Sequence, residues 1–143
     1  MRRILTVVAA LLLLVLPWLP VTAREGEDDY PAGADVATLS KDGSAVGRLD
    51  KLRVAGKYTV FDVYADWCAP CREVDRRLRE IVATRTDVAI RKLNVVDFDT
   101  PLARELGPSF EALPYLVVFT PTGKKAEVIG LDLPRLEKAL AKK

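Results

Sequence analysis

The chain has 143 residues, half of them hydrophobic, with 22 Lys or Arg and 20 Asp or Glu. Residues 1–23 hold two of the basic residues and no acidic one, so the rest of the chain carries 20 of each and is formally neutral. A neutral domain lacks the basic surface that nucleic-acid binding requires. The chain has no His, which excludes a Ser-His-Asp triad, a Cys-His protease pair and a His-ligated metal site.

The first 23 residues have the pattern of a cleavable signal peptide. Arg2 and Arg3 precede an apolar run over residues 4–16, and Val21-Thr22-Ala23 supplies small or modest residues before a cleavage point. This order is typical of an export signal, and its short apolar core fits a bacterial one. We therefore expect cleavage after Ala23 and a periplasmic protein. The alternative is an uncleaved segment that anchors the protein in the inner membrane.

The remaining chain divides into a leader and one domain. Residues 24–34 are polar and acidic, with a Pro and a Gly near their end, and they are predicted to form a flexible leader because they cannot bury apolar surface. Residues 35–143 are long enough for a single core. This domain is predicted to open with a hairpin, in which residues 36–39 and 45–46 pair across the Asp42-Gly43 turn signal.

The later elements alternate between strands and helices. Strands are predicted at residues 58–64, 88–96, 115–120 and 126–129, and helices at 68–84, 102–106 and 132–140. A short helix or turn is expected near residues 49–54. The charged residues of the first long helix are predicted to form a solvated face: Arg72, Glu73, Asp75, Arg76, Arg77, Arg79 and Glu80. The fold class is therefore α/β, a three-layer α/β/α sandwich with a central mixed sheet and an N-terminal hairpin extension.

The two cysteines of the chain, Cys68 and Cys71, lie where a predicted strand ends and a helix begins. Unpaired N–H groups at a helix N-terminus favour a thiolate, so Cys68 is predicted to be the nucleophile. Cys71, deeper in the helix, is predicted to be the resolving thiol that attacks the mixed disulfide. Ala69 and Pro70 separate the two, and proline suits a first helical turn.

Other interpretations of the cysteine pair are weaker. A structural disulfide is possible in an exported protein, but so short a loop would stabilise the fold little. A zinc site would need two more ligands, and the chain has no other Cys and no His. Redox chemistry is the favoured interpretation, with no metal and no bound cofactor.

The segment Val-Tyr-Ala-Asp-Trp-Cys-Ala-Pro-Cys at residues 63–71 resembles the active-site segment of the thioredoxin superfamily, and the resemblance extends over about residues 58–140. The Tyr-Ala-Asp-Trp-Cys part is similar to the periplasmic thioredoxin domain of transmembrane reductant-relay proteins. The Asp42-Gly43 turn and the Gly56-Lys57 lead-in resemble small exported thioredoxin-like proteins that include cytochrome-maturation reductases. The resemblance implies a thioredoxin fold and thiol–disulfide oxidoreductase activity.

The resemblance also implies roles for two charged residues. Asp62, six residues before Cys68, would be a buried acid that accepts the proton of Cys71, and Lys92 would pair with Asp62. The residues alone leave alternatives open. Asp62 could instead face outward from a half-exposed strand, and Lys92 could be a solvated lysine at a sheet edge.

The substrate-binding residues implied by the resemblance lie around the cysteines. Pro114 would follow a cis peptide bond, and the backbone of Leu113 would bind an extended substrate strand. Trp67 would cover part of the substrate surface, and Gly130 would lie in a nearby loop. The alternatives are a trans proline that begins a strand, a packed Trp and an ordinary turn glycine.

The predicted function is that of a protein-disulfide reductase or isomerase of the cell envelope. Ala69 and Pro70 between the cysteines lack the histidine found in strong periplasmic oxidants, and they are expected to tune the redox potential together with Lys92. Protein thiols and disulfides are the expected substrates, a membrane thiol-reductant relay is the expected electron donor, and a monomer is expected. The alternatives are an apocytochrome c thiol reductase and a non-catalytic thioredoxin-fold chaperone or binding module.

Overall fold

The computed structural model describes residues 30–141, so the predicted signal peptide and most of the predicted leader lie outside the described residues. The elements in chain order are β1 (Asp35–Ser40), the 3-10 helix η2 (Leu49–Lys51), β2 (Tyr58–Tyr64), α1 (Ala69–Thr84), β3 (Val88–Asn94), α2 (Pro101–Leu106), β4 (Tyr115–Phe119), β5 (Lys125–Ile129) and α3 (Leu133–Ala139). Between residues 30 and 141, no helix has the length and apolar character needed to cross a bilayer.

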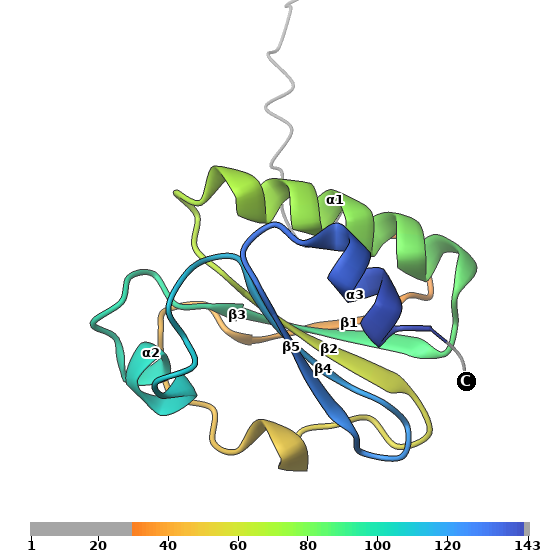
Figure 1. Ribbon diagram of the computed structural model, residues 1–143, viewed down its shortest axis with the longest axis horizontal. Helices are drawn as coiled ribbons and strands as arrows, with labels where there is room; N and C mark the ends of the chain where they lie inside the picture. The colour runs from red at the N-terminus through yellow and green to blue at the C-terminus, as the bar shows by residue number, and fades with distance from the viewer. Residues whose placement is uncertain (1–29, 142–143) are drawn as a thin grey trace, which may run out of the picture.

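The five strands form one mixed sheet in the order β1-β3-β2-β4-β5. β1 and β2 both run parallel to β3, whereas β4 is antiparallel to its neighbours β2 and β5. β2 lies at the centre of the sheet (Figure 1) and is buried along nearly its whole length, which agrees with its largely apolar and aromatic sequence. The predicted mixed sheet is confirmed.

Helices cover both faces of this sheet (Figure 1). On one face, Leu78 of α1 and Leu136 of α3 pack into a core cluster with Val60 of β2. On the other face, Leu102 of α2 packs into a second cluster with Phe61, the next residue of β2. Successive strand residues point to opposite faces, so β2 supplies both cores. The predicted three-layer sandwich is confirmed.

The predicted N-terminal hairpin is wrong. β1 pairs in parallel with β3, and a parallel pair needs a long crossover and not a tight turn. The turn after β1 is held instead by distant segments. The Gly43 N–H donates to the Asn94 carbonyl at 3.1 Å, and the Gly43 carbonyl accepts from the Leu102 N–H at 2.9 Å. Residues 45–46 form no strand.

The end of the predicted leader is part of the folded structure. Tyr30 and Ala34 are partly buried and pack against the core between the sheet and helices α1 and α3. Tyr30 also donates a hydrogen bond to Asp75 of α1 at 2.7 Å. Residues 30–34 of the predicted leader are therefore part of the folded structure that the described residues form.

Candidate active site

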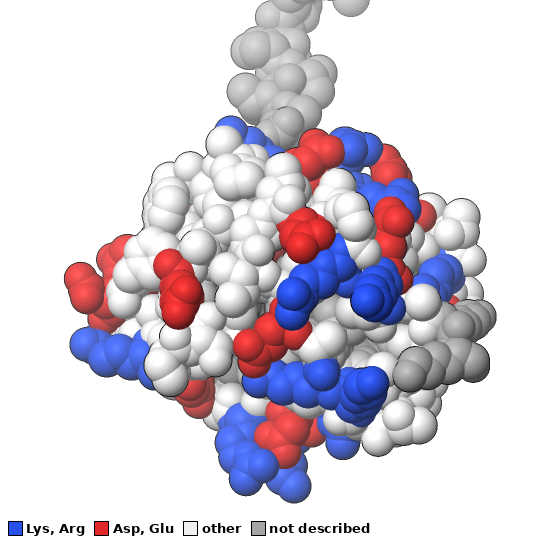
Figure 2. All heavy atoms as spheres, in the orientation of Figure 1, with Lys and Arg blue, Asp and Glu red and all other residues white. Residues whose placement is uncertain are grey.

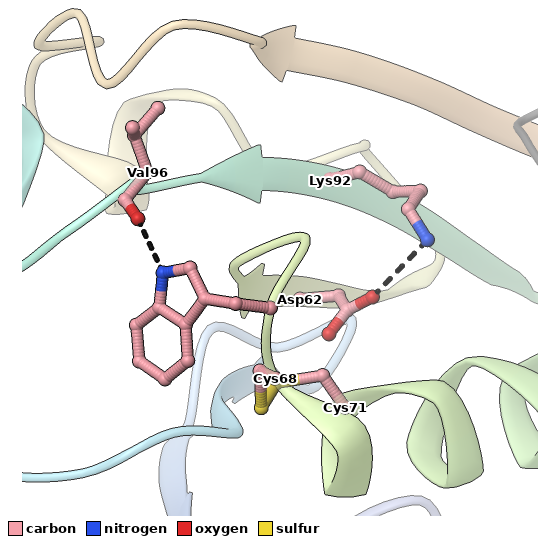
Figure 3. Close-up of a disulfide and its surroundings, with 6 residues drawn as sticks. Asp62, Cys68, Cys71, Lys92 and Val96 are labelled. Carbon is pink, nitrogen blue, oxygen red and sulfur yellow. Dashed lines mark hydrogen bonds and ion pairs between the residues drawn. A yellow bond between two sulfur atoms is a disulfide. The ribbon is translucent and has the colours of Figure 1, made fainter.

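The two cysteines form a disulfide at the beginning of α1 (Figure 3), and their Cα atoms are 5.3 Å apart. Cys68 is the N-cap residue of the helix, and Cys71 lies in its first turn. Both are nearly inaccessible, with 3% and 4% of their surfaces exposed, whereas Ala69 and Pro70 between them are exposed. The structure therefore places the predicted redox pair at the junction of strand and helix.

The helix end beside Cys68 favours negative charge. The first N–H groups of a helix have no partner within the helix, and its dipole is positive at this end. The first turn of α1 contains no acidic residue to compete for these groups, and Arg72 lies in it. After reduction, the thiolate form of Cys68 is therefore favoured, and this is the form that attacks disulfides.

Asp62 lies on β2 next to the disulfide, with its carboxylate between the cysteines and Lys92 (Figure 3). Only 1% of its surface is exposed, which excludes an outward-facing position. Neither carboxylate oxygen has a hydrogen-bond partner among the described residues. Burial raises the pKa of Asp62 to about 6, the positive charge of Lys92 opposes this rise, and the negative charge of Asp75 adds to it. Asp62 is therefore able to exchange a proton near neutral pH.

Lys92 lies directly opposite Asp62 in the register of β2 and β3. It is 7% exposed, so it is not a solvated edge lysine. Its Nζ atom is 3.5 Å from Asp62 Oδ2, and it forms a closer ion pair with Asp75 of α1. Burial lowers the pKa of the Lys92 amine, but the two carboxylates outweigh this effect and raise the pKa above its ordinary value. Lys92 therefore remains an ammonium ion shared by two acids.

Lys92 lies in a polar cluster with Asp62, Asp75 and Tyr30. The last two of these residues were not predicted from the sequence to lie at the site. Asp75 was assigned to the solvated face of the helix, but it is turned toward Lys92 with Arg79 beside it at 3.1 Å. Tyr30 was assigned to the leader. Asp75 follows Cys71 by four residues and so shares its side of the helix, which is a signal that could have revealed it. No pattern in the sequence connects Tyr30 to this cluster.

A groove of about 790 Å³ gives the buried acid a route to the surface. Its walls include both cysteines, Asp62, Asp75 and Lys92. Within residues 30–141, no group of three or more His, Cys, Asp or Glu side chains could hold a metal ion. The chemistry that the groove supports is proton transfer beside the disulfide.

The peptide bond between Leu113 and Pro114 is cis, as the resemblance implied. Leu113 packs against the apolar cluster that contains both cysteines. The Pro114 carbonyl accepts a hydrogen bond from the Gly130 N–H at 2.8 Å, and Gly130 has a φ of 72°, a conformation that glycine adopts easily. Leu113, Pro114 and Gly130 are thus brought together beside the redox pair.

Trp67 is 59% exposed and is held by a neighbouring loop. Its indole N–H donates to the Val96 carbonyl at 2.7 Å. Val96 has a φ of 65°, which is unusual for a β-branched residue, and its N–H donates to Asn94 Oδ1 at 2.8 Å. Trp67 was expected at the site from the resemblance, whereas Asn94 and Val96 were not, since left-handed backbone at a valine has no sequence signature.

An apolar surface adjoins the cysteines. Val96 and Phe98 are exposed beside Trp67, and the rings of Trp67 and Phe98 are 6.1 Å apart. Figure 2 shows a broad uncharged area where α1 begins, with a few charged side chains at its outer edge, whereas acidic and basic side chains gather more densely farther along α1 and over α3. This surface can contact apolar parts of a protein substrate.

Comparison with known proteins agrees with this geometry. A family model described as Thioredoxin matches residues 49–142. A thioredoxin of Alternaria alternata is 32% identical over 89 residues, which are 62% of this chain and 73% of that protein. Mitochondrial thioredoxin-2 of Schizosaccharomyces pombe is 32% identical over 88 residues, and the match spans 62% of this chain but only 64% of that protein. The thiol:disulfide interchange protein DsbD of a Pseudomonas species is 31% identical over 80 residues, 53% of this chain and 14% of that protein.

Solved structures show the same fold. The thioredoxin of Malassezia sympodialis superposes with a TM-score of 0.55 at 26% identity, covering 75% of this chain and 91% of that one. The short form of thioredoxin F from spinach chloroplast gives a TM-score of 0.59 at 22% identity, with the same coverage, and this likeness concerns the fold alone. Because the family model covers more than half of the chain, and the fold and the cysteine pair agree with it, the chain belongs to the thioredoxin family of thiol–disulfide oxidoreductases.

Proposed function

We propose that this protein reduces or isomerises disulfide bonds of protein substrates in the cell envelope. The observation that carries the proposal is the position of the buried Asp62 beside a cysteine pair at the start of α1. An acid that titrates near neutral pH next to a disulfide equips the site for thiol exchange. The envelope location rests on the signal pattern of residues 1–23, which lie outside the described residues.

The reaction proceeds in two exchange steps. The Cys68 thiolate attacks a substrate disulfide, so a mixed disulfide forms and one substrate sulfur leaves as a thiolate. Cys71 then gives its proton to Asp62 and attacks the Cys68 sulfur. The bond between Cys68 and the substrate breaks, the disulfide between Cys68 and Cys71 forms, and the second substrate sulfur leaves. Two electrons pass from the protein to the substrate, and a thiol reductant restores the reduced pair.

The reducing direction is supported by the residues between the cysteines. Ala69 and Pro70 offer no side chain that could hydrogen-bond a thiolate, and the chain contains no His. A less stabilised thiolate makes the disulfide form less oxidising. The likeness to part of a thiol:disulfide interchange protein supports a membrane thiol-reductant relay as the electron donor.

Protein substrates are supported by the surface around the site. Trp67, Val96 and Phe98 offer an exposed apolar area next to the cysteines. We propose that the backbone of Leu113, beside the cis peptide bond to Pro114, binds an extended substrate segment, and that Gly130 lies at the edge of this binding region. A monomer is sufficient for this chemistry, because one chain supplies all of the residues named here.

The reduction potential tests the direction of electron flow. It is measured by equilibrating the protein with thiol buffers and trapping free thiols, with the fluorescence of Trp67 as a second signal. We expect a value near that of thioredoxin, about −270 mV. A value near about −120 mV, typical of a strong periplasmic oxidant, would contradict the proposal and make the protein a disulfide donor.

The location is tested by fractionating bacterial cells that express the full chain. We expect the protein in the periplasmic fraction, with an N-terminus that begins at Arg24 by mass spectrometry. Recovery in the membrane fraction at full mass would support the anchored alternative. Recovery in the cytoplasm would contradict an envelope function.

A binding role is the second candidate, favoured by the exposed apolar surface at Trp67. The double variant Cys68→Ser, Cys71→Ser separates the two. Reduction of insulin disulfides should vanish, whereas suppression of aggregation by a chaperone would persist. Replacing insulin by an oxidised apocytochrome c peptide tests the reductase of cytochrome maturation, which would reduce that peptide preferentially.

A further inference from the structure

Two carboxylates compete for one buried ammonium ion beneath the active site. Lys92 Nζ lies 3.5 Å from Asp62 Oδ2 (Figure 3) and closer to Asp75 Oδ1. Asp62 comes from the strand beside Lys92 in the sheet, whereas Asp75 comes from α1, one helical turn after Cys71. The ammonium ion is therefore drawn away from the acid that serves the cysteines.

The position of Asp75 is fixed from two further directions. The Tyr30 hydroxyl donates to Asp75 Oδ1 at 2.7 Å, and Arg79 Nη2 lies 3.1 Å from Asp75 Oδ2. The Tyr30 ring also lies beside Lys92, with its centroid 5.5 Å from Nζ, and the Tyr64 ring lies on another side at 4.8 Å. These contacts leave the Lys92 ammonium ion in one place, held toward Asp75.

The two acids respond differently to the same environment. Burial raises the pKa of both, but contacts with Lys92, Tyr30 and Arg79 outweigh burial at Asp75 and lower its pKa below the ordinary value. At Asp62 burial prevails and the pKa is about 6. The pKa of the Tyr30 hydroxyl is raised by burial and by the charge of Asp75, so the hydroxyl stays protonated and remains a donor. Asp62 alone of the two carboxylates changes charge near neutral pH.

We propose that Asp75, oriented by Tyr30, is a positioning residue that holds Lys92 away from Asp62 and thereby sets the pH range in which Asp62 accepts the Cys71 proton. The inference rests on the proposed function, in which the proton of the Cys71 thiol passes to the Asp62 carboxylate as Cys71 attacks the mixed disulfide. A carboxylate bonded directly to an ammonium ion is a weaker base, and a weaker base accelerates the attack less.

The groups that face this cluster come from several elements. Tyr64 lies on β2 with Asp62, Lys92 on β3, and Tyr30 before β1. The groove beside the cluster is lined in addition by Asp66 before α1 and by charged residues of α1, namely Arg72, Glu73, Arg76 and Arg79. Glu73 and Arg76 pair with each other, and Glu73 makes no ion pair with Lys92 among the contacts of the described residues. Glu73 therefore provides a matched control for the loss of one negative charge from α1.

The test isolates the attack by Cys71. The reduced full-length protein is mixed rapidly with an equimolar amount of Ellman's reagent, and the second phase of thiol release reports attack on the mixed disulfide. The rate of this phase is measured from about pH 5 to about pH 8. We expect the rate of the wild-type protein to rise with pH along a limb centred near pH 6, where Asp62 loses its proton. In Asp75→Asn the limb should move to lower pH by about one unit, and the plateau rate should fall roughly threefold.

Three further variants decide how the result is interpreted. Asp75→Glu retains the charge and should restore the position of the limb, Tyr30→Phe should shift it in the same direction but by less, and Glu73→Gln should leave it unchanged. Equal behaviour of Asp75→Asn and Glu73→Gln would overturn the inference. The oxidised form of each variant is also followed by NMR titration of an isotope-labelled Asp62 carboxyl, which needs no turnover and shows that the variant is folded.

Failure of the proposed function has a different signature. If Asp62→Asn kept the limb near pH 6, Asp62 would not be the proton acceptor, and that part of the proposed function would be rejected together with the inference. If the limb vanished in Asp62→Asn but did not move in Asp75→Asn, only the role of Asp75 would be rejected.

Discussion

Neighbouring residues of β2 show how the two faces of the sheet differ. Phe61 points toward α2 into a cluster of apolar side chains and both cysteines, and its ring meets that of Phe119 edge to face. Asp62 points toward α1, where an otherwise apolar core ends in the cluster with Lys92, Asp75 and Tyr30. The comparison teaches that both sides of β2 stabilise the fold, through Phe61 on one side and Val60 on the other, and that only at Asp62 does the strand place a buried carboxyl group in the core.

The largest effect is expected from Phe61→Ala. Phe61 has no exposed surface, and truncating a buried Phe leaves a cavity that costs about 3–5 kcal/mol. Urea unfolding of the oxidised variant measures this loss. The position of the pH limb of thiol exchange should stay the same, because no charge has moved. A stability loss below about 1 kcal/mol would contradict the stabilising role assigned to the α2 side.

Asp62→Asn, by contrast, should change how the stability of the protein depends on pH. At low pH, Asp62 is neutral in both the folded and the unfolded protein, so it does not make the free energy of unfolding depend on pH. As the pH rises through the ordinary value of 3.8, the unfolded state ionises first, and stability is lost until the pH passes the folded pKa of about 6. The total loss is about 3 kcal/mol. Above the folded pKa, the full loss is present in wild type and absent in the variant.

The prediction is therefore checked by measuring the free energy of unfolding of both proteins at two pH values. The free energy of unfolding of Asp62→Asn relative to wild type should increase by about 2 kcal/mol between about pH 4 and about pH 7, because the rest of the loss lies below about pH 4, and this holds whatever constant cost the buried amide brings. Glu111→Gln, which removes an exposed carboxylate, should show no such increase. A pH-independent difference for Asp62→Asn would show that Asp62 does not carry a raised pKa.

The same comparison explains how much the sequence could predict. The β-forming residues of β2 and the helical spacing of Val74 and Leu78 depend on local periodicity, so the strands and helices from β2 onward were predicted to within two residues of their observed ends. The cysteine pair followed from its spacing at the start of a helix, and Asp62 followed from the resemblance to the thioredoxin superfamily. The hairpin was wrong because Gly43 bonds to Asn94 and Leu102, and such distant partners leave no trace in the local sequence.

The charged cluster was harder to predict for a physical reason. Acidic and basic residues spaced along a helix usually face solvent, and Asp75 differs from Glu73 only because a buried lysine of β3 lies beneath it. Tyr30 joins the cluster only because the residues just before β1 pack beside α1, where its hydroxyl donates to Asp75. Both contacts depend on tertiary packing, so the resemblance implied the buried pair of Asp62 and Lys92 but not the contributions of Asp75 and Tyr30.

A smaller effect on stability is expected from a substitution at Val96, whose carbonyl accepts the hydrogen bond of the Trp67 indole. Val96 has a φ of 65°, a conformation that costs a residue with a side chain about 1–2 kcal/mol. Val96→Gly should therefore stabilise the protein by up to about 1 kcal/mol, since part of the gain is lost to the greater freedom of glycine in the unfolded chain. Thermal unfolding measures this, and destabilisation of the variant would contradict it.

The smallest effect is expected from the converse change at Gly130. Its φ is 72°, and a Cβ atom added there would meet no atom within 4 Å, so the cost of Gly130→Ala is backbone strain alone, about 1 kcal/mol. Gly43→Ala is the informative contrast, because Gly43 has a similar φ of 78° but a Cβ atom there would lie 2.6 Å from Thr100. If thermal unfolding showed equal losses for the two variants, crowding would add nothing to strain. A greater loss for Gly43→Ala would show that crowding against Thr100 adds to strain at that position, and the loss at Gly130 would then measure the strain of its backbone conformation, which directs its N–H to the Pro114 carbonyl.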